Sequence, residues 1–385
     1  MINNLHHLFQ TIWQKIFGIF LQATDAFYRV FVRLLYHSKI VGVLALFCLI
    51  IFVTSISLFL SVFKEENSKK ESQSKSQNDS QGFYAIDVGQ GDSSLYITNE
   101  NQTVLIDTGK PGNGIVQKLE KILGKYRKKI DVIILTHPDS DHVGEIENIL
   151  ASYEVGLILY SPIYDVRPDS EKAIKNIRKK NHGLTQPVFA GENLSFSKSI
   201  EDINKNQNEN EQMYFLSPSF SGIATFASKK ELAEDNYFSV VSLIKSKDLI
   251  FTMADAPQKI EKVLVSSADN QLFSSSSVSA QVSETVDIFS QLPNFTGEEF
   301  NRNQFDKIIL KVGHHGSKTS SAPEFIKKLS PTDVILSYGK NNRYGHPHKE
   351  VLDLFENGTS TSSTSLNSSP IRIYRTISGA VYFGE

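Results

Sequence analysis

The chain has 385 residues, with 40 basic and 42 acidic side chains and 40% hydrophobic residues, enough for one large core or two medium ones. The near-zero net charge gives no whole-chain signal for nucleic acid, although a local basic groove would not show in this total. The single cysteine, Cys48, excludes a disulfide framework and a thiolate metal cluster. Any bound metal must therefore be held by histidine and carboxylate side chains.

The first 63 residues carry membrane signals. Residues 1–39 place apolar side chains at helical spacing among lysines and arginines, which is typical of a helix on a membrane surface or against another protein's helices. Residues 40–63 contain no charge and span about 36 Å at 1.5 Å per residue, which predicts one transmembrane helix in contact with lipid. The excess of basic residues before this helix favours a single-pass cell-membrane protein whose large domain is extracellular. The oligomeric state stays open.

Residues 64–81 are polar and predict a solvated linker, so the globular domain is expected at 82–385. Short apolar strands are expected at 83–88, 93–98, 102–107 and 131–135, and helices at 112–126 and 143–153. Strands that alternate with helices indicate a layered α/β domain. Three loops interrupt this order, at 199–213, about 266–303 and 357–369, and a last strand pair is expected near 371–374 and 380–383.

The densest chemical signal follows the apolar run at 131–135. Residues 137–142 read HPDSDH, which places His137, Asp139, Asp141 and His142 within six positions. Imidazole nitrogen and carboxylate oxygen are ligands that zinc, manganese and iron accept in hydrolytic sites. The first two side chains can point toward one ion and the last two toward a second. Two ions about 3.5–4 Å apart can hold a hydroxide and clamp a substrate oxygen.

This segment resembles the His-x-His-x-Asp-His signature of the metallo-β-lactamase fold, with Asp139 where most members have their second histidine. The substitution is typical of the ComEC branch, the competence DNA-uptake proteins with a hydrolase-like C-terminal domain. Further motifs resemble this branch in order over residues 82–385: DVGQGDS at 87–93, LIDTG at 105–109, TMAD at 252–255, LKVGHHGSKTS at 310–320 and NRYGHPH at 342–348. The resemblance implies an α/β fold, the metallo-β-lactamase αββα sandwich, here preceded by a single N-terminal transmembrane helix.

The resemblance also implies residue roles. Two divalent ions, zinc in preference to manganese, would be held by His137, Asp139, Asp141, His142, Asp255 and His346, with Asp255 as the bridge. Asp141, His314 and His315 would be catalytic, although the sequence does not say which of His314, His315 and His346 is a ligand and which acts as an acid. Ser317, Lys318 and His348 would contact substrate. Asp87, Asp92, Asp107 and Asn236 would support the site, although the aspartates could equally cap turns. Lys311 and Lys318 could support a phosphate or be solvated surface charges.

The sequence therefore predicts a membrane-anchored, metal-dependent hydrolase, a phosphodiesterase or nuclease that acts through a metal-held hydroxide. The resemblance favours DNA as the substrate. One alternative is a phosphodiester of the cell envelope, such as a phosphocholine-decorated polymer. Another is a non-catalytic binding protein that retains a decayed metal fold. The unusual Ala254 and Glu145, at positions where the family usually has glycine, favour the last interpretation, and the intact HPDSDH motif argues against it.

Overall fold

The structure is a computed structural model that describes residues 81–181, 183–196, 211–219, 234–265, 305–357 and 370–384. The chain divides into two compact units, Met1–Gln77 and Asn78–Glu385, and the described residues all lie in the second. Within these ranges no helix is long and apolar enough to cross a membrane. The predicted surface helix at 1–39, the transmembrane helix at 40–63, the linker up to residue 80 and the insertion at 266–303 lie outside the described residues.

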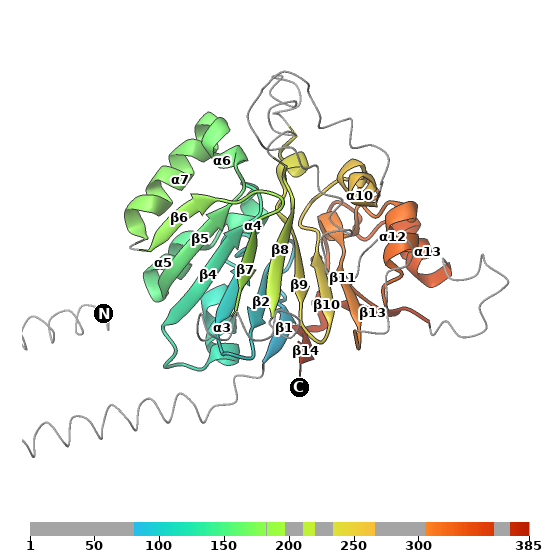
Figure 1. The fold of residues 1–385 in the computed structure, drawn as a ribbon, viewed down its shortest axis with the longest axis horizontal. Helices are drawn as coiled ribbons and strands as arrows, with labels where there is room; N and C mark the ends of the chain where they lie inside the picture. Colours follow the sequence, from blue (N-terminus) through green and yellow to red (C-terminus); the bar gives the residue numbers. More distant parts are fainter. Residues whose placement is uncertain are drawn as a thin grey trace, which may run out of the picture. The chain divides into compact units, whose positions relative to one another are not determined.

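Two seven-stranded sheets form the centre of the domain (Figure 1). The first sheet has the order β14 (Val381–Gly384), β1 (Gly82–Ala85), β2 (Ser94–Ile97), β3 (Thr103–Ile106), β4 (Lys129–Leu135), β5 (Glu154–Tyr160) and β6 (Leu184–Pro187). The second has the order β13 (Arg372–Arg375), β12 (Asp333–Leu336), β11 (Ile308–Lys311), β10 (Leu249–Thr252), β9 (Val241–Lys245), β8 (Gln212–Ser217) and β7 (Asn193–Ser195). Strands β3 to β6 run parallel, as do β10 to β13.

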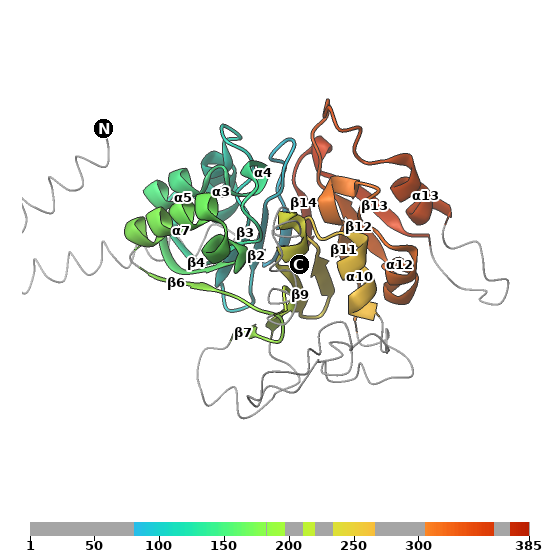
Figure 2. The same cartoon turned by 90° about the horizontal axis from the view of Figure 1, so that it is seen from above.

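Helices cover the outer face of each sheet (Figure 2). The first sheet carries α3 (Ile115–Leu123), α5 (Ile146–Ser152) and α7 (Pro168–Lys180), with the short α4 (Ser140–Val143) and α6 (Ile163–Val166) beside them. The second carries α10 (Gln258–Val265), α12 (Pro323–Leu329) and α13 (Lys349–Asn357). A third apolar cluster fills the space between the two sheets. The predicted two-sheet α/β architecture is therefore confirmed, with the layers in αββα order.

The central strands read as continuous apolar runs because both of their faces are buried. In β4, Ile133 packs toward the helices of the first sheet, while its neighbour Ile134 packs against the second sheet. In β11, Ile308 and Ile309 divide in the same way between the outer and inner layers. These strands are held firmly on both sides, so the loops at their carboxyl ends start from fixed positions.

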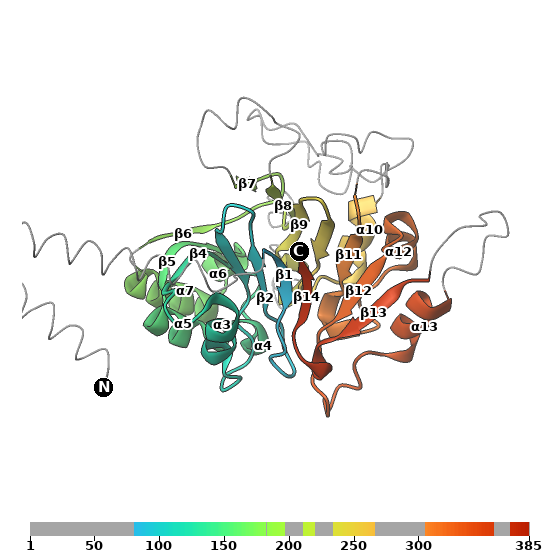
Figure 3. The ribbon, with the colours of Figure 1, turned by 90° about the horizontal axis from the view of Figure 1, so that it is seen from below.

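The predicted elements need three corrections. The helix expected at 143–153 is shorter, α5 at Ile146–Ser152, and the separate short helix α4 precedes it. Of the polar loop expected at 199–213, residues 199–210 lie outside the described residues, whereas Gln212 and Met213 belong to β8 and Met213 is buried. The expected C-terminal strand pair is wrong, because β13 pairs with β12 and β14 pairs with β1 in the other sheet (Figure 3). Residues 376–379 turn the chain from one sheet to the other, so each strand finds its partner elsewhere.

Candidate metal centre

Chemically active side chains follow five strand ends that meet at one edge of the domain. Parallel strands of both sheets end here, and the carboxyl edge of parallel strands is where α/β folds place their sites. Asp107 follows β3, residues 136–144 follow β4, Asp255 follows β10, residues 313–320 follow β11 and residues 337–348 follow β12. The sequence motifs that lie far apart along the chain are therefore brought together from both sheets.

Two overlapping groups of side chains could each hold a metal ion. His137, His142 and Asp255 form one group, and Asp141, His142 and His315 form the other, with the ligand atoms of each group within 4.8 Å of one another. All of these residues except Asp141 are buried. The structure thus brings together five of the side chains that the sequence predicted as ligands or catalytic groups.

Asp255 lies between the two groups and faces histidines with both oxygens. Its Oδ1 is 3.2 Å from Nε2 of His142 and 3.7 Å from Nε2 of His315. Its Oδ2 is 3.8 Å from Nε2 of His137 and 3.6 Å from Nε2 of His314. This position suits a carboxylate shared between two ions.

Asp139 and Asp141, the two acids of the HPDSDH motif, reach the centre from its outer side. Asp139 Oδ2 is 3.7 Å from Nε2 of His137, and Asp141 Oδ2 is 3.3 Å from Nε2 of His315. Asp139 is the more exposed of the two, with 48% of its side chain open to solvent compared with 30% for Asp141. The first acid therefore stands at the open mouth of the centre.

The three buried histidines share one protonation pattern. His142 Nδ1 is 2.7 Å from a carboxylate oxygen of Asp107, and His315 Nδ1 is 2.9 Å from the carbonyl oxygen of Ser337. His137 Nδ1 is 3.1 Å from Oγ1 of Thr136, whose own proton is donated to Asp107. Each of these oxygens accepts, so each Nδ1 donates, and in the neutral ring each Nε2 carries the lone pair.

These lone pairs have no partner within the described residues. Nε2 of His137, His142 and His315 and Oδ1 of Asp255 are all buried without a hydrogen bond. Buried polar atoms in native proteins are nearly always paired, so a set of such atoms that converges on one place without partners indicates a binding site. A divalent cation would satisfy nitrogen lone pairs and a carboxylate together. The residues present therefore fit a metal.

The charges of the centre point the same way. Burial raises the pKa of Asp255, but the surrounding histidines outweigh it and hold that pKa well below its usual range. Burial likewise opposes ionisation of Asp141, yet His315 and His142 hold its pKa at about 2. Burial lowers the pKa of His142, whereas Asp255 and Asp107 raise it well above its usual value. Because the carboxylates remain ionised, the centre attracts protons or, when a metal enters, a cation in their place.

The backbone is strained where the ligands are presented. Asp107, Ala254, His314 and His315 adopt positive φ angles of 58°, 47°, 50° and 57°. Such conformations each cost about 1–3 kcal/mol in residues other than glycine. Ala254 occupies the position where the family usually has glycine, and it keeps the left-handed conformation that glycine would adopt. Its carbonyl accepts a hydrogen bond from the backbone of His314 at 2.8 Å.

The loop at 87–93 supports the centre through its backbone. The amide of Asp92 donates to the carbonyl oxygen of Asp141 at 3.0 Å. A Cβ atom on Gly91, which has a φ of 137°, would lie only 2.3 Å from that carbonyl oxygen, so the close approach requires glycine. Asp87, by contrast, accepts a 3.0 Å hydrogen bond from Gly89 in its own turn. It therefore caps a turn, which was the simpler of the two interpretations of this residue.

The side chain of Asp92 forms a buried ion pair with Lys311 from β11. Only 3% of the Lys311 side chain is exposed. The expectation that Lys311 is a surface charge or a phosphate contact is therefore wrong. Lys311 neutralises Asp92 behind the centre and does not face substrate, because β11 directs the lysine side chain inward, between the loops of the two sheets.

The three predicted substrate contacts, Ser317, Lys318 and His348, lie in different surroundings. Ser317 is buried, and its Oγ accepts hydrogen bonds from the backbone and hydroxyl of Thr319 at 3.3 and 3.0 Å. His348 accepts a 3.1 Å hydrogen bond from the Lys318 backbone. Lys318 is exposed and lines a pocket beside the centre. Of these residues, Lys318 is the one that the structure places on that pocket.

His346 lies close to the centre but in neither three-residue group. Its ring centroid is 5.7 Å from that of His314 and 6.2 Å from that of His315. Its Nδ1 is buried and has no hydrogen-bond partner in the part of the chain that the structure describes. Burial, followed by the neighbouring histidines, lowers the pKa of His346 to about 4. Its ring is therefore neutral at physiological pH.

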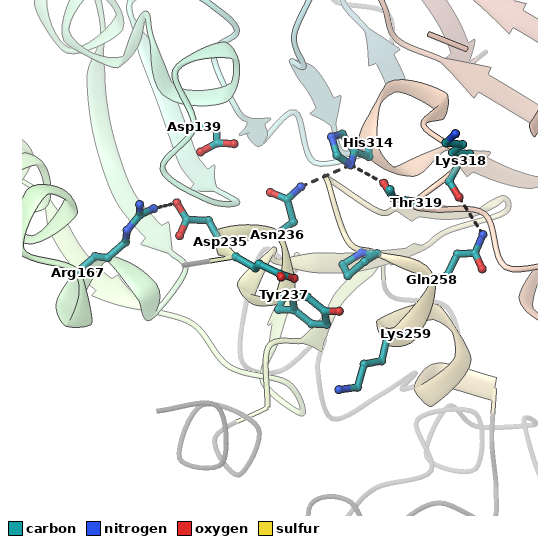
Figure 4. Close-up of a pocket in the computed structure, with 12 residues that line it drawn as sticks. Asp139, Arg167, Asp235, Asn236, Tyr237, Gln258, Lys259, His314, Lys318 and Thr319 are labelled. Carbon is teal, nitrogen blue, oxygen red and sulfur yellow. Dashed lines mark hydrogen bonds and ion pairs between the residues drawn. The ribbon is translucent and has the colours of Figure 1, made fainter. Parts of the chain in front are cut away.

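A pocket of about 690 Å³ opens beside His314 and Asp139 (Figure 4). Asn236 stands in its wall with Nδ2 3.5 Å from Nδ1 of His314. Eight further lining residues were not among the predicted site residues: Arg167, Glu234, Asp235, Tyr237, Pro257, Gln258, Lys259 and Thr319. Arg167 pairs with Asp235, and the Lys259 ammonium lies 5.6 Å from the Tyr237 ring centroid.

The departure at Glu145 has a structural role. One carboxylate oxygen of Glu145 accepts a hydrogen bond from the Gly112 backbone, and the other accepts one from the Asn148 side chain at 2.6 Å. The glutamate thus ties the loop before α3 to the start of α5. Its presence does not indicate a decayed site.

Comparisons with known proteins agree with this geometry. The model of the metallo-beta-lactamase superfamily matches residues 86–213. ComE operon protein 3 of Bacillus subtilis is 29% identical over 288 residues, which cover 70% of this chain and 30% of the relative. Recombination protein 2 of Haemophilus influenzae is 24% identical, covering 75% and 28%, and competence protein ComA of Neisseria gonorrhoeae is 23% identical, covering 77% and 31%.

Among solved structures, the metallo-beta-lactamase fold protein YhfI from Bacillus subtilis is 12% identical, with a TM-score of 0.41, covering 79% of this chain and 100% of that chain. Residues 86–213 match the metallo-beta-lactamase superfamily, and the αββα fold and the HPDSDH motif agree with this match; a fold of this type implies divalent metal binding. The domain resembles the ComEC type through its similarity to these three competence and recombination proteins. The chain spans about 30% of the length of these relatives.

Proposed function

We propose that this chain is a membrane-anchored, metal-dependent phosphodiesterase. The observation that carries the proposal is the set of four buried ligand atoms without partners, three histidine Nε2 atoms and Oδ1 of Asp255. The superfamily is hydrolytic in general, and this arrangement retains what hydrolysis requires. A pair of divalent ions, zinc in preference to manganese, would supply a Lewis acid and activate water at neutral pH.

We assign His137 and Asp139 to one ion and Asp141, His142 and His315 to the other, with Asp255 between them. The 3.7 Å separation of Asp139 from His137 and the group formed by Asp141, His142 and His315 support this division, and His142 also belongs to the group of His137 and Asp255, where the two sites meet. The hydrogen bond from His315 Nδ1 to Ser337 favours His315 as a ligand, because it leaves Nε2 facing the centre. Asn236, where related enzymes have another histidine, would leave the first ion with fewer protein ligands and more open to substrate.

His314 is better suited to substrate than to metal. It is 27% exposed, lines the pocket and has its Nδ1 3.0 Å from Oγ1 of Thr319. Burial lowers the pKa of His314, as it does for His346. Neutral rings donate hydrogen bonds to a phosphate oxygen, so we assign both histidines to orienting the phosphodiester.

The pocket favours a phosphodiester of nucleic acid over one that carries choline. A quaternary ammonium group is usually recognised by several aromatic rings. The described lining of the pocket contains one such ring, Tyr237, and the Lys259 ammonium lies over it. Lys259 and Lys318 instead suit additional phosphates. The names of the relatives, competence and recombination proteins, also favour DNA.

We further propose that residues 40–63 anchor the chain and that the hydrolase domain lies outside the cell. The uncharged run and the basic residues before it support this arrangement. A protease added to intact cells should remove the domain and leave the N-terminal segment protected. Protection of the domain in intact cells, with cleavage after lysis, would place it inside.

Activity tests should use the full-length protein in detergent. We expect at least one equivalent of bound zinc or manganese and hydrolysis of bis-p-nitrophenyl phosphate and single-stranded DNA, but not of a β-lactam. His142→Ala and Asp255→Asn should abolish hydrolysis while the fold is retained. Asp353→Asn, which removes a surface acid paired with Lys349, should leave it unchanged. Less than one equivalent of metal, or full activity in both centre variants, would refute the proposal.

A further inference from the structure

The loop between β12 and α13 carries an exposed aromatic side chain next to the centre. Tyr344 is 51% exposed. Its ring stacks on that of His346, with the centroids 5.6 Å apart and the planes at 24°. The Arg343 guanidinium lies 5.2 Å from the Tyr344 ring centroid and donates a 3.1 Å hydrogen bond to its hydroxyl. A cation and an aromatic ring are therefore held together at the surface.

This pair is the outer end of a row of planar groups. His346 stacks at 27° with His315, and the two ring centroids are 6.2 Å apart. His315 is one of the buried histidines of the centre. The row therefore runs from the candidate ligand His315 through His346 to Tyr344 and Arg343 in solvent.

Hydrogen bonds hold the loop in this shape. The Asn342 side chain donates to the carbonyl oxygens of Gly339 and His346 at 3.0 and 2.7 Å and accepts from the His346 amide at 2.9 Å. Gly339 in turn donates to the Gln90 side chain at 3.0 Å. A surface that is fixed before binding loses little conformational entropy when a ligand arrives.

The charge of the loop favours a polyanion. Between residues 339 and 348 there are two cations, Lys340 and Arg343, and no carboxylate. Both cations are exposed. Exposed aromatic rings beside arginine are the groups on which the bases of single strands stack, while the charge attracts the backbone.

We propose that Tyr344 and Arg343 form a stacking subsite for a nucleobase of a single-stranded nucleic acid whose phosphodiester lies at the metal centre. The subsite rests on the proposed phosphodiesterase function for its position, but it adds a separate contact with a base. Stacking tolerates any base, because every base has an aromatic face. The subsite would therefore favour unpaired strands over duplexes without selecting a sequence.

The test is fluorescence anisotropy of the full-length, zinc-loaded protein with a labelled phosphorothioate oligonucleotide, which resists cleavage. Tyr344→Leu should weaken binding by about 5- to 150-fold, the range for loss of one stacked base. Tyr344→Phe keeps the ring and should bind as the unaltered protein does, while Arg343→Gln should weaken binding. Tyr126→Leu removes another exposed tyrosine, 68% exposed and outside the site, and should have no effect.

An abasic oligonucleotide of the same length separates base stacking from phosphate contact. It should bind equally to the unaltered protein and to Tyr344→Leu. Unchanged oligonucleotide binding by a folded Tyr344→Leu variant, or an equal loss with the abasic strand, would overturn the proposal. So would a Tyr344-dependent affinity for a glycerol phosphate polymer that matches the affinity for DNA, since this would assign the ring to envelope polymers.

Hydrolysis of bis-p-nitrophenyl phosphate by the unaltered protein is measured in parallel. Hydrolysis without any effect of Tyr344→Leu on binding would refute the subsite and leave the proposed function intact. Base-dependent binding through Tyr344 without hydrolysis would refute the proposed function and leave the subsite as part of a binding protein.

Discussion

His142 donates a 2.7 Å hydrogen bond from Nδ1 to Oδ2 of Asp107, and this contact turns its Nε2 toward Asp255. The same carboxylate accepts hydrogen bonds from the backbone and hydroxyl of Thr136 at 2.9 and 2.6 Å. Because Thr136 in turn contacts His137, one buried acid orients two histidines. Groups behind metal ligands contribute strongly to affinity by fixing the ligand's orientation and basicity.

Replacing Asp107 by asparagine should therefore weaken metal binding. We expect about 10- to 100-fold lower affinity for Asp107→Asn, measured by competition with a chromophoric chelator. Asp87→Asn makes the same chemical change in a turn cap and should keep the original affinity. Equal affinities in the two variants would show that Asp107 does not orient the ligands.

Removal of metal should destabilise the folded domain. An ion present at 100 times its dissociation constant stabilises the native state by about 2.7 kcal/mol, so a chelator should lower the melting temperature by several degrees. The measurement is thermal unfolding with and without chelator. His142→Ala lacks a ligand common to both groups and should show a much smaller shift. The same shift in both proteins would mean that metal binds elsewhere.

Breaking the Lys311–Asp92 pair should be costly because both side chains are buried. Lys311→Met leaves an uncompensated acid and should lower the free energy of unfolding by about 3–5 kcal/mol. The double change Lys311→Met with Asp92→Leu should recover much of this loss. Lys349→Met breaks an exposed pair and should cost at most about 1 kcal/mol. Urea unfolding measures all four proteins, and a loss for Lys311→Met as small as that for Lys349→Met would contradict the prediction.

Glu261 should make stability depend on pH. Burial raises its pKa from 4.5 to about 7, despite hydrogen bonds from the Ala322 and Ser321 backbones. The folded state then holds a proton that the unfolded state releases, so this contribution is complete below about pH 4.5 and declines as pH rises to about 7. The total is roughly 3 kcal/mol. Urea unfolding between about pH 4.5 and 7 should show the free energy of unfolding decline in the unaltered protein but not in Glu261→Gln. If the free energies of the two proteins change with pH in parallel, the assignment to Glu261 is refuted.

The left-handed conformation of Ala254 predicts an unusual gain from glycine. Ala254→Gly should raise the free energy of unfolding by up to about 1 kcal/mol, because glycine adopts a φ of 47° without steric cost. Ala256→Gly, two residues later and outside the left-handed region, should instead lower it. Melting temperatures of the two variants provide the comparison, and a loss of stability in both would show that Ala254 is not strained.

The sequence predicted what local patterns encode. The apolar run at 131–135 and the HPDSDH motif after it placed His137, Asp139, Asp141 and His142 at a strand end, where the structure has them. It did not predict that Lys311 is buried or that Arg167 and Lys259 line the pocket, since both depend on contacts between distant segments. The pairing of the last two strands with different sheets was missed for the same reason. The alternation of apolar residues shows that a segment is a strand, but it does not show with which other strand that segment pairs.

Asp255 follows β10 of the second sheet, and His137 and His142 follow β4 of the first. An ion held by these residues would join positions 142 and 255 and fasten the two halves of the sandwich to each other. In a covalent cross-link, closing a loop of about 100 residues contributes about 4.7 kcal/mol through the unfolded state. This chain has one cysteine and cannot form an internal disulfide. A bound metal would take the place of that cross-link. Loss of the ion would then weaken the contact between the two sheets as well as abolish hydrolysis.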